Sequence, residues 1–170
     1  MSISVREMTL AETPMVMDYF RTSTPEFLET MGVDPTRFPP PREWTERLRQ
    51  LYDLPIERRW SLFVVWLRDG RPVGFSSCDK ITFGEQAHMH LQIFESENRR
   101  RGLGVECVRR SVVVYFERLR LKRLFAEPNA YNVAPNRTLQ KAGFKYLKTH
   151  KTVPSPINFH QAVTRWVIER

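Results

Sequence analysis

The chain has 170 residues, of which 41% are hydrophobic and 27% charged, so it has the composition of a globular protein. This length suits a single domain spanning residues 1–170. No apolar run approaches the roughly 20 residues of a membrane span, and no signal-peptide core opens the chain, so we expect a cytoplasmic protein without a membrane partner. The net charge of +8 favours an anionic partner or cofactor. We expect no nucleic-acid partner, because the basic residues are scattered and not interleaved with aromatic residues.

The first third of the chain predicts one strand followed by short helices. Residues 3–8 alternate apolar and polar side chains, as in a half-buried strand. Thr9 and Glu12 have the spacing of a capping box, and an amphipathic helix follows them. Thr24-Pro25 opens a second short helix, and residues 44–52 carry apolar side chains at helical spacing.

The middle of the chain predicts three consecutive strands. Residues 61–67 are almost all apolar and rich in β-branched or aromatic side chains, which indicates a central strand. The dipeptide at 69–70, Asp-Gly, indicates a hairpin turn, and residues 73–78 form its returning strand. Gly84 marks the next turn. Cys78 and Cys107 are far apart in apolar surroundings and form no Cys-x-x-Cys motif, which indicates buried, reduced thiols.

The stretch from Gln86 to Val105 combines a strand, a charged turn and a helix entry. Gly102 and Gly104 fall at the predicted helix N-terminus, where backbone N–H groups and the positive end of the helix dipole collect. Three consecutive arginines at 99–101 add positive charge. This chemistry suits a phosphate or pyrophosphate. The spacing matches neither a P-loop nor Gly-x-Gly-x-x-Gly, and reads instead Arg-x-x-Gly-x-Gly.

The last third predicts a short strand at 123–126, a helix at 134–141 ended by Gly143, and two closing strands at 144–149 and 162–168. The overall prediction is a mixed α/β (α+β) fold. Its central sheet is mostly antiparallel, contains a splayed pair of strands and is flanked by helices. Residues 132–144 carry an asparagine before the predicted helix, a lysine near its end, and then a glycine and a phenylalanine. These are Asn132, Lys141, Gly143 and Phe144.

Taken together, the arginine–glycine turn and the Asn132–Phe144 segment resemble the GCN5-related N-acetyltransferase (GNAT) family. The resemblance implies the GNAT-like acyl-CoA fold, acetyl-CoA as co-substrate, and transfer of an acetyl group to a primary amine of a small molecule or peptide by direct attack in a ternary complex. It also implies that main-chain groups of one strand line the pantetheine arm, that the glycine turn holds the pyrophosphate, and that the asparagines bind the arm from the far side. The implied cofactor-binding residues are Gln92, Ile93, Phe94, Arg99, Arg100, Arg101, Gly102, Leu103, Gly104, Val105, Asn132, Asn136 and Lys141.

The candidate for the general base is His88, and its neighbour His90 is the second histidine that could take this role. His88 lies eleven residues before the arginine turn, and His90 faces the same side of an unbroken strand. An imidazole titrates near neutrality and can take a proton directly or through water. A purely structural role for both histidines is the alternative, and Glu95 and Glu97 are alternative bases. The pattern supplies no third ligand, so no metal is expected.

The sequence departs from the family pattern at the general acid. Leu139 stands where many members carry a tyrosine, and Pro135 where some branches carry a serine. The thiolate therefore leaves unassisted or receives its proton from elsewhere. An acyl-CoA-binding sensor without catalysis and a basic nucleic-acid-binding module are the competing interpretations. The acceptor is left open, although residues 24–54 and the loop at 151–160 are expected to shape its pocket. A homodimer through the last strands is also left open.

Overall fold

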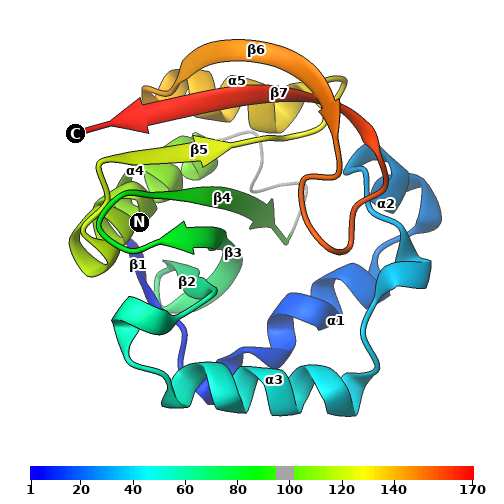
Figure 1. Cartoon of the computed structure of the whole chain (residues 1–170), viewed down its shortest axis with the longest axis vertical. Coiled ribbons are helices and arrows are strands. Elements are labelled where there is room, and N and C mark those ends of the chain that lie inside the picture. The colour runs from blue at the N-terminus through cyan, green and yellow to red at the C-terminus, as the bar shows by residue number, and fades with distance from the viewer. Residues whose placement is uncertain (95–101) are drawn as a thin grey trace.

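The computed structural model describes residues 1–94 and 102–170. In this part of the chain one sheet has the strand order β1-β2-β3-β4-β5-β7-β6 (Figure 1). Every pair is antiparallel except β4 and β5, which are parallel. This confirms the predicted mixed, mostly antiparallel fold. The strands are β1 (Ile3–Glu7), β2 (Leu62–Arg68), β3 (Arg71–Thr82), β4 (Gln86–Ile93), β5 (Arg123–Ala126), β6 (Lys145–Thr152) and β7 (Gln161–Glu169).

The helices fall into two groups along the chain. Three precede β2 and two follow β4, with single 3-10 turns at Leu10–Glu12, Pro35–Arg37 and Ile56–Arg58. The predicted capping box of Thr9 and Glu12 starts the 3-10 turn at Leu10–Glu12. The α-helix itself begins after this turn, with Pro14 at its first position. The α-helices are α1 (Pro14–Thr22), α2 (Pro25–Thr30), α3 (Pro41–Asp53), α4 (Leu103–Leu119) and α5 (Val133–Ala142).

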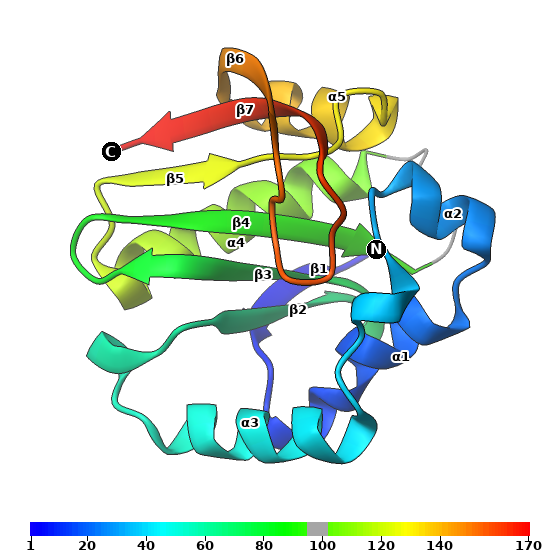
Figure 2. The same ribbon diagram turned by 45° about the vertical axis from the view of Figure 1, so that its right-hand side comes forward.

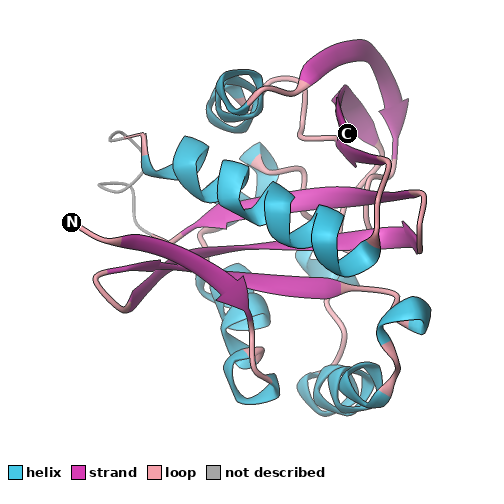
Figure 3. Cartoon of the chain, turned by 90° about the vertical axis from the view of Figure 1, so that its left-hand side faces the viewer, coloured by secondary structure: helices cyan, strands magenta, loops and turns pink. Residues whose placement is uncertain are grey.

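Strand β2 lies at the centre of two hydrophobic cores, because its alternate side chains point to opposite faces of the sheet. Leu62, Val64 and Trp66 pack with α4 and α5. Phe63 and Val65 pack with α1, α2 and α3. Figure 3 shows the resulting layers, with α4 on one side of the strands and the N-terminal helices on the other. A strand buried on both faces needs apolar side chains on both, and β2 has them from Leu62 to Leu67, before Arg68 ends it.

Two buried hydrogen bonds fix α4 against the sheet. The Trp66 Nε1–H donates to Ser111 Oγ at 2.8 Å, and the hydroxyls of Ser76 and Tyr115 lie 2.7 Å apart. All four side chains are shielded from solvent, so each polar atom has its partner within the protein. Helix α4 is thereby held in one rotational setting, and its N-terminus with it.

The predicted turn residues have the expected backbone conformations. Gly70, Gly84 and Gly143 have φ angles of 78°, 80° and 105°, and Asp69 has a φ of 48°. Strand β3 is longer than residues 73–78, which the sequence indicated, because it continues through a register shift between Asp79 and Thr82. This extension carries Asp79 into the sheet.

The pairing between strands β4 and β5 ends halfway along β4. Their pairing runs from Gln86↔Arg123 to Met89↔Ala126, where β5 ends, while β4 continues to Ile93. Beyond Met89 the edge of β4 that faces β5 therefore has no β5 partner among the described residues. This is the predicted splay, and it separates the second half of β4 from β5.

Candidate active site

Strand register brings four ionisable side chains onto one face of the sheet. Asp79 of β3 lies opposite His88 of β4, and His88 lies opposite Phe125 of β5. His90 is two residues beyond His88, and Glu127 is two residues beyond Phe125, so both share this face. It is the face covered by α1, α2 and α3, whose hydrophobic core includes Phe63, Val65 and Phe75.

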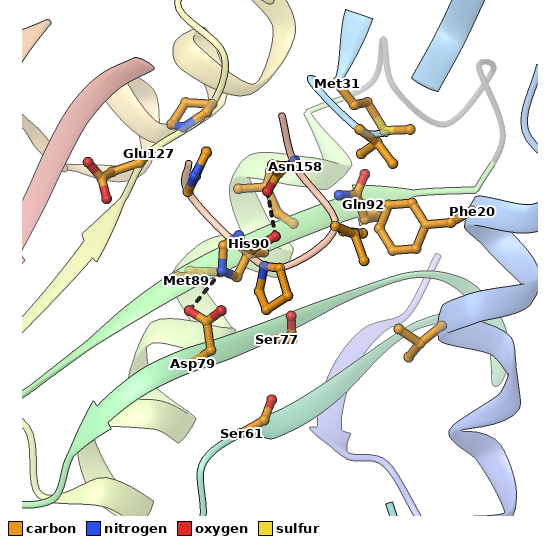
Figure 4. A pocket seen from close by; sticks show the side chains of 18 of the residues that line it. Phe20, Met31, Ser61, Ser77, Asp79, Met89, His90, Gln92, Glu127 and Asn158 are labelled. Carbon is orange, nitrogen blue, oxygen red and sulfur yellow. Dashed lines mark hydrogen bonds and ion pairs between the residues drawn. The ribbon is translucent and has the colours of Figure 1, made fainter. Parts of the chain in front are cut away.

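His90 and Asp79 form a hydrogen-bonded pair, with His90 Nε2 and Asp79 Oδ1 2.9 Å apart (Figure 4). Both side chains are about one-quarter exposed, at 26% and 23%. Burial lowers the pKa of His90, but the charge and hydrogen bond of Asp79 outweigh it and raise the pKa above the usual value. Burial raises the pKa of Asp79, but the charge and hydrogen bond of His90 outweigh it and lower that pKa below its usual value. The pair combines an oriented imidazole with a carboxylate that stays ionised.

Glu127 is the centre of a second, more deeply buried cluster. Its carboxylate lies 3.2 Å from His88 Nδ1, 2.6 Å from His150 Nε2 and 4.0 Å from Arg165, and its side chain is 5% exposed. Burial raises the pKa of Glu127, but hydrogen bonds from the two histidines and the charge of Arg165 lower it to about 2. Arg165 also stacks on Phe125, with its guanidinium carbon 4.1 Å from the ring centroid. The Glu127 carboxylate is therefore anionic at neutral pH.

A cavity of about 310 Å3 runs along this face of the sheet. Asp79, His90 and Glu127 line it, whereas His88, 11% exposed, lies behind Glu127 and is absent from the lining. Figure 4 shows Asp79 and His90 at the sheet wall, with Phe20 and Met31 across the cavity. Its volume is at the lower end of the range for small-molecule sites. Of the two candidate bases, His90 is the one that contacts the cavity.

The described residues contain no group of three or more His, Cys, Asp or Glu side chains arranged to hold a metal ion. Nor is any helix in residues 1–94 and 102–170 long and apolar enough to cross a membrane.

The glycine turn meets the splay at the start of α4. Gly102 has a φ of 71° and open space where a Cβ would stand, and Gly104 lies in the first turn of the helix. A Cβ on Gly104 would lie 3.0 Å from Ile93 Cδ1 and 3.5 Å from Thr138 Cγ2. Leu103 is buried in the core, and Val105 packs against it. The helix N-terminus is thus held close to the free edge of β4, an arrangement that suits a polyphosphate-bearing ligand beside an extended arm.

The three predicted residues at the end of β4 have different surroundings. Gln92 lines the cavity. The backbone N–H of Phe94 donates to the carbonyl of Val73 at 3.0 Å, and its ring packs against Phe75 with the centroids 5.9 Å apart. Ile93 packs at the edge of the core beside Gly104. Arg99, Arg100 and Arg101, and the alternative bases Glu95 and Glu97, lie outside the described residues.

The predicted cofactor-binding residues of the 132–144 segment also have different surroundings from one another. Asn132 is the N-cap residue of α5 and lines the cavity. Asn136 uses its amide within the protein, donating to the carbonyls of Asn129 and Asn132 at 3.0 and 2.8 Å and accepting from Trp166 Nε1 at 2.9 Å. Lys141 is exposed, and its carbonyl accepts from Arg109 at 2.8 Å.

Sequence reasoning missed Asp79, Glu127, His150 and Arg165. Glu127 had a usable signal, because an acidic residue directly after the short strand at 123–126 lies at a strand end, where sites in α/β proteins gather. The other three depend on a register shift or on strands distant in sequence, and no local pattern marks them.

Comparison with known proteins agrees with this geometry. A family model described as "Acetyltransferase (GNAT) domain" matches residues 3–145. No curated protein sequence matches the chain. Among solved structures, the aminoglycoside acetyltransferase AAC(6')-Ib in complex with coenzyme A superposes with a TM-score of 0.70 at 18% identity, covering 99% of this chain and 95% of that one.

Two further structures come from enzymes that modify ribosomal proteins. The ribosomal-protein-S5-alanine acetyltransferase from Vibrio fischeri has a TM-score of 0.74 at 19% identity, with 98% and 92% coverage. The ribosomal L7/L12 alpha-N-protein acetyltransferase RimL, in complex with coenzyme A, has a TM-score of 0.76 at 14% identity, with 99% and 94% coverage. At these identities the likeness establishes the fold.

The fold and the splayed site define an acyl-CoA N-acyltransferase. The chain belongs to the GNAT acetyltransferase family, since the family model spans most of its length. It is accordingly an acetyl-CoA-dependent N-acetyltransferase, with acetyl-CoA as its co-substrate, as the sequence predicted.

Proposed function

We propose that this enzyme acetylates a primary amine by direct attack on the acetyl-CoA thioester in a ternary complex, with His90 as the general base. The observation that carries the proposal is the His90–Asp79 pair, which lines the cavity on the strand whose edge becomes free at Met89. His88, the other candidate base, serves as a positioning residue for Glu127.

The described residues fit the co-substrate at three points. The first turn of α4, with Gly102 and Gly104, would hold its phosphates; the free edge of β4 would hold the extended arm; and Asn132 borders the cavity on the far side. Acetyl-CoA supplies an activated acyl thioester when bound.

His90 has the properties required for taking a proton from an ammonium group. When the imidazole is neutral, Nε2 donates to the Asp79 carboxylate, which leaves the lone pair on Nδ1 as the proton acceptor. Asp79 also stabilises the imidazolium that forms. The carboxylate of Glu127, which lines the same cavity, attracts and orients the ammonium group before it loses its proton.

Direct transfer is favoured over a covalent acyl-enzyme by the state of the thiols. The chain has two cysteines, Cys78 and Cys107, and both are free and fully buried. Burial raises the pKa of the Cys107 thiol to about 12 and that of Cys78 well above its usual value. Neither forms the thiolate that nucleophilic catalysis requires.

No tyrosine is among the described residues that line the cavity, and Leu139, at the position of the family's usual acid, is fully buried in the core. We therefore propose that the thiolate leaves without a protein general acid, which its low basicity permits.

The test compares two histidine variants in a continuous assay of thiol release from acetyl-CoA with a small primary amine. We expect His90→Gln to lower kcat by about 10²- to 10⁴-fold, the usual contribution of a general base. We expect His88→Gln, the matched control two residues away, to lose less than about tenfold, because its imidazole lies behind Glu127. Thermal unfolding with and without acetyl-CoA verifies that both variants fold and bind. Equal losses in the two variants, or full activity of His90→Gln, would contradict the assignment.

A further inference from the structure

The β6–β7 loop covers the cavity on the side away from the sheet. This loop, residues 153–160, is here called the strap, and Figure 2 shows it descending from β6 across β4 and β3 before returning to β7. Its residues Pro154, Ser155, Pro156, Ile157 and Asn158 line the cavity. The strap gives the cavity a roof opposite Asp79 and His90.

Hydrogen bonds attach the strap to the segment that follows α2. The carbonyl of Gly32 accepts from the backbone N–H of Phe159 at 3.2 Å, from Asn158 Nδ2 at 2.9 Å and from Gln161 Nε2 at 2.8 Å. The backbone N–H of Asp34 donates to the carbonyl of Ile157 at 2.8 Å. The strap is therefore fixed at its tip as well as at its two ends.

Gly32 leaves this junction no room for a side chain. Its φ is 71°, and a Cβ there would overlap the side-chain amide of Gln161, which is itself held by Asn129 Nδ2 at 2.8 Å. The two prolines of the strap restrict its backbone further. The strap therefore closes one side of the cavity, so an acceptor must enter along the side that the strap leaves open, which favours a small molecule over the N-terminus of a folded protein.

The wall between the strap and the N-terminal helices is apolar and aromatic. Its members come from α1, the segment after α2, α3, the segment before β2, β2 and β3. They include Phe20, Met31, Trp44, Trp60, Phe63 and Phe75. Such a wall binds the apolar body of a ligand, with polar groups at one end fixing its orientation.

The charges at the cavity favour a ligand with one ammonium group. At the sheet wall, the carboxylates of Asp79 and Glu127 line the cavity, whereas the cations beside them, Lys80 and Arg165, are outside its lining. Arg37 and Arg47 also line the cavity and are exposed, so they stand where it meets solvent. They would repel the additional ammonium groups of a polyamine or aminoglycoside.

We infer that the acceptor is a small monoamine with an apolar, ring-sized body, bound beneath the strap with its ammonium group toward Glu127 and His90. This inference rests on the proposed function and narrows its acceptor. It sets this chain apart from what the names of its structural neighbours state, since those enzymes act on aminoglycosides and ribosomal proteins.

The experiment measures kcat/KM with acetyl-CoA and three amines: 2-phenylethylamine, spermidine and a hexapeptide with a free α-amino group. We expect 2-phenylethylamine to exceed the other two by about tenfold or more, the scale of discrimination that a shaped apolar pocket provides. Turnover of spermidine or the peptide at an equal or higher kcat/KM would overturn the inference and leave the proposed function standing. Turnover of none of the three amines, in a protein that acetyl-CoA stabilises, would overturn both.

Two strap variants extend the test. Asn158→Ala removes one of the bonds to the Gly32 carbonyl, and we expect the advantage of 2-phenylethylamine over the peptide to shrink by about threefold or more, as loss of a buried hydrogen bond allows. His160→Ala, on the same loop but exposed and outside the cavity lining, should keep the wild-type ratio. An unchanged ratio in a folded Asn158→Ala protein would contradict the role of the strap, and the wild-type panel decides the acceptor class even if this variant does not fold.

Discussion

Replacing Gly104 by valine tests whether the start of α4 is the phosphate-binding part of the site. A Cβ at this position would lie 3.0 Å from Ile93 Cδ1, closer than normal van der Waals contact, and 3.5 Å from Thr138 Cγ2. Valine adds two further methyl groups in the same space, so the side chains of Ile93 and Thr138, or the elements that carry them, must shift. Overpacking of this kind costs about 1–3 kcal/mol of unfolding free energy.

We expect this shift to weaken acetyl-CoA binding as well, because it changes the position of the helix N-terminus relative to the edge of β4. With acetyl-CoA at about 100 times its Kd, the wild type gains about 2.7 kcal/mol, and a tenfold loss of affinity halves this to about 1.4 kcal/mol. For a chain of this length each kcal/mol is worth about 2–4 °C, so the ligand-induced rise in Tm falls from about 5–10 °C to about 3–5 °C. The assay is thermal unfolding with and without acetyl-CoA.

Gly84→Ala is the matched control. Gly84 has a φ of 80° and nothing within 4 Å of its missing Cβ, so alanine there costs about 1–2 kcal/mol of backbone strain without steric overlap. Its backbone N–H donates to the carbonyl of Leu119, at the far end of α4 and about 22 Å from Gly104 along the helix. The Gly84→Ala protein should have a lower Tm than the wild type, but acetyl-CoA should raise that Tm by the full wild-type amount. If acetyl-CoA raised the Tm of the Gly104→Val protein as much as that of the wild type, the start of α4 would not be the phosphate-binding part of the site.

Three further predictions concern individual side chains. Asp79→Asn removes the carboxylate that raises the pKa of His90 and leaves the burial that lowers it, so the acid limb of the pH profile of kcat/KM should move to lower pH; an unmoved limb would exclude His90 as the titrating base. Glu127 has a pKa of about 2 against a usual 4.5, so its stabilising contribution is complete above pH 4.5 and is lost as the pH falls toward 2. Denaturant unfolding should therefore show that the unfolding free energy of Glu127→Gln falls less steeply with pH over this range than that of the wild type. The same pH dependence in both proteins would contradict this role of Glu127. Asn136→Ala leaves Trp166 Nε1 without its acceptor and should cost about 1–3 kcal/mol in thermal unfolding, whereas a stable variant with weakened acetyl-CoA binding would assign Asn136 to the ligand instead.

Much of the fold could be predicted from local sequence, because its signals are short-range. The glycines at 70, 84 and 143 occupy backbone conformations that other residues rarely adopt. The apolar run of β2 is buried on both faces, and such strands carry no polar residues. Turn chemistry and hydrophobic patterning together were sufficient to order the strands before α4.

The site was less predictable, because it depends on pairing between distant strands. The sequence favoured His88 as the base and noted His90 only as its neighbour on the same face of the strand, whereas it is His90 that lines the cavity. The partner of His90, Asp79, lies beyond the expected end of β3, where a register shift follows it. His150 and Arg165 reach Glu127 from β6 and β7, which lie beside β5 only after the sheet has formed. Hydrophobic periodicity carries no information on such contacts.

The sequence indicated the roof of the cavity only in outline. The loop at residues 151–160 was expected to help shape the acceptor pocket, but its local pattern does not show how the loop is held in place. Its hydrogen bonds to the segment after α2 join residues more than a hundred positions apart, and the requirement for glycine at position 32 is set by the Gln161 side chain.

The most direct test of the central claim follows where the acetyl group goes. The purified protein is mixed with acetyl-CoA alone, and its intact mass is measured before and after a small primary amine is added. The direct-attack account predicts an unchanged protein mass in the first step, followed by one acetylated amine for each thiol released. Build-up of an acetylated protein at Cys78 or Cys107 before the amine is added, and its discharge afterwards, would contradict it.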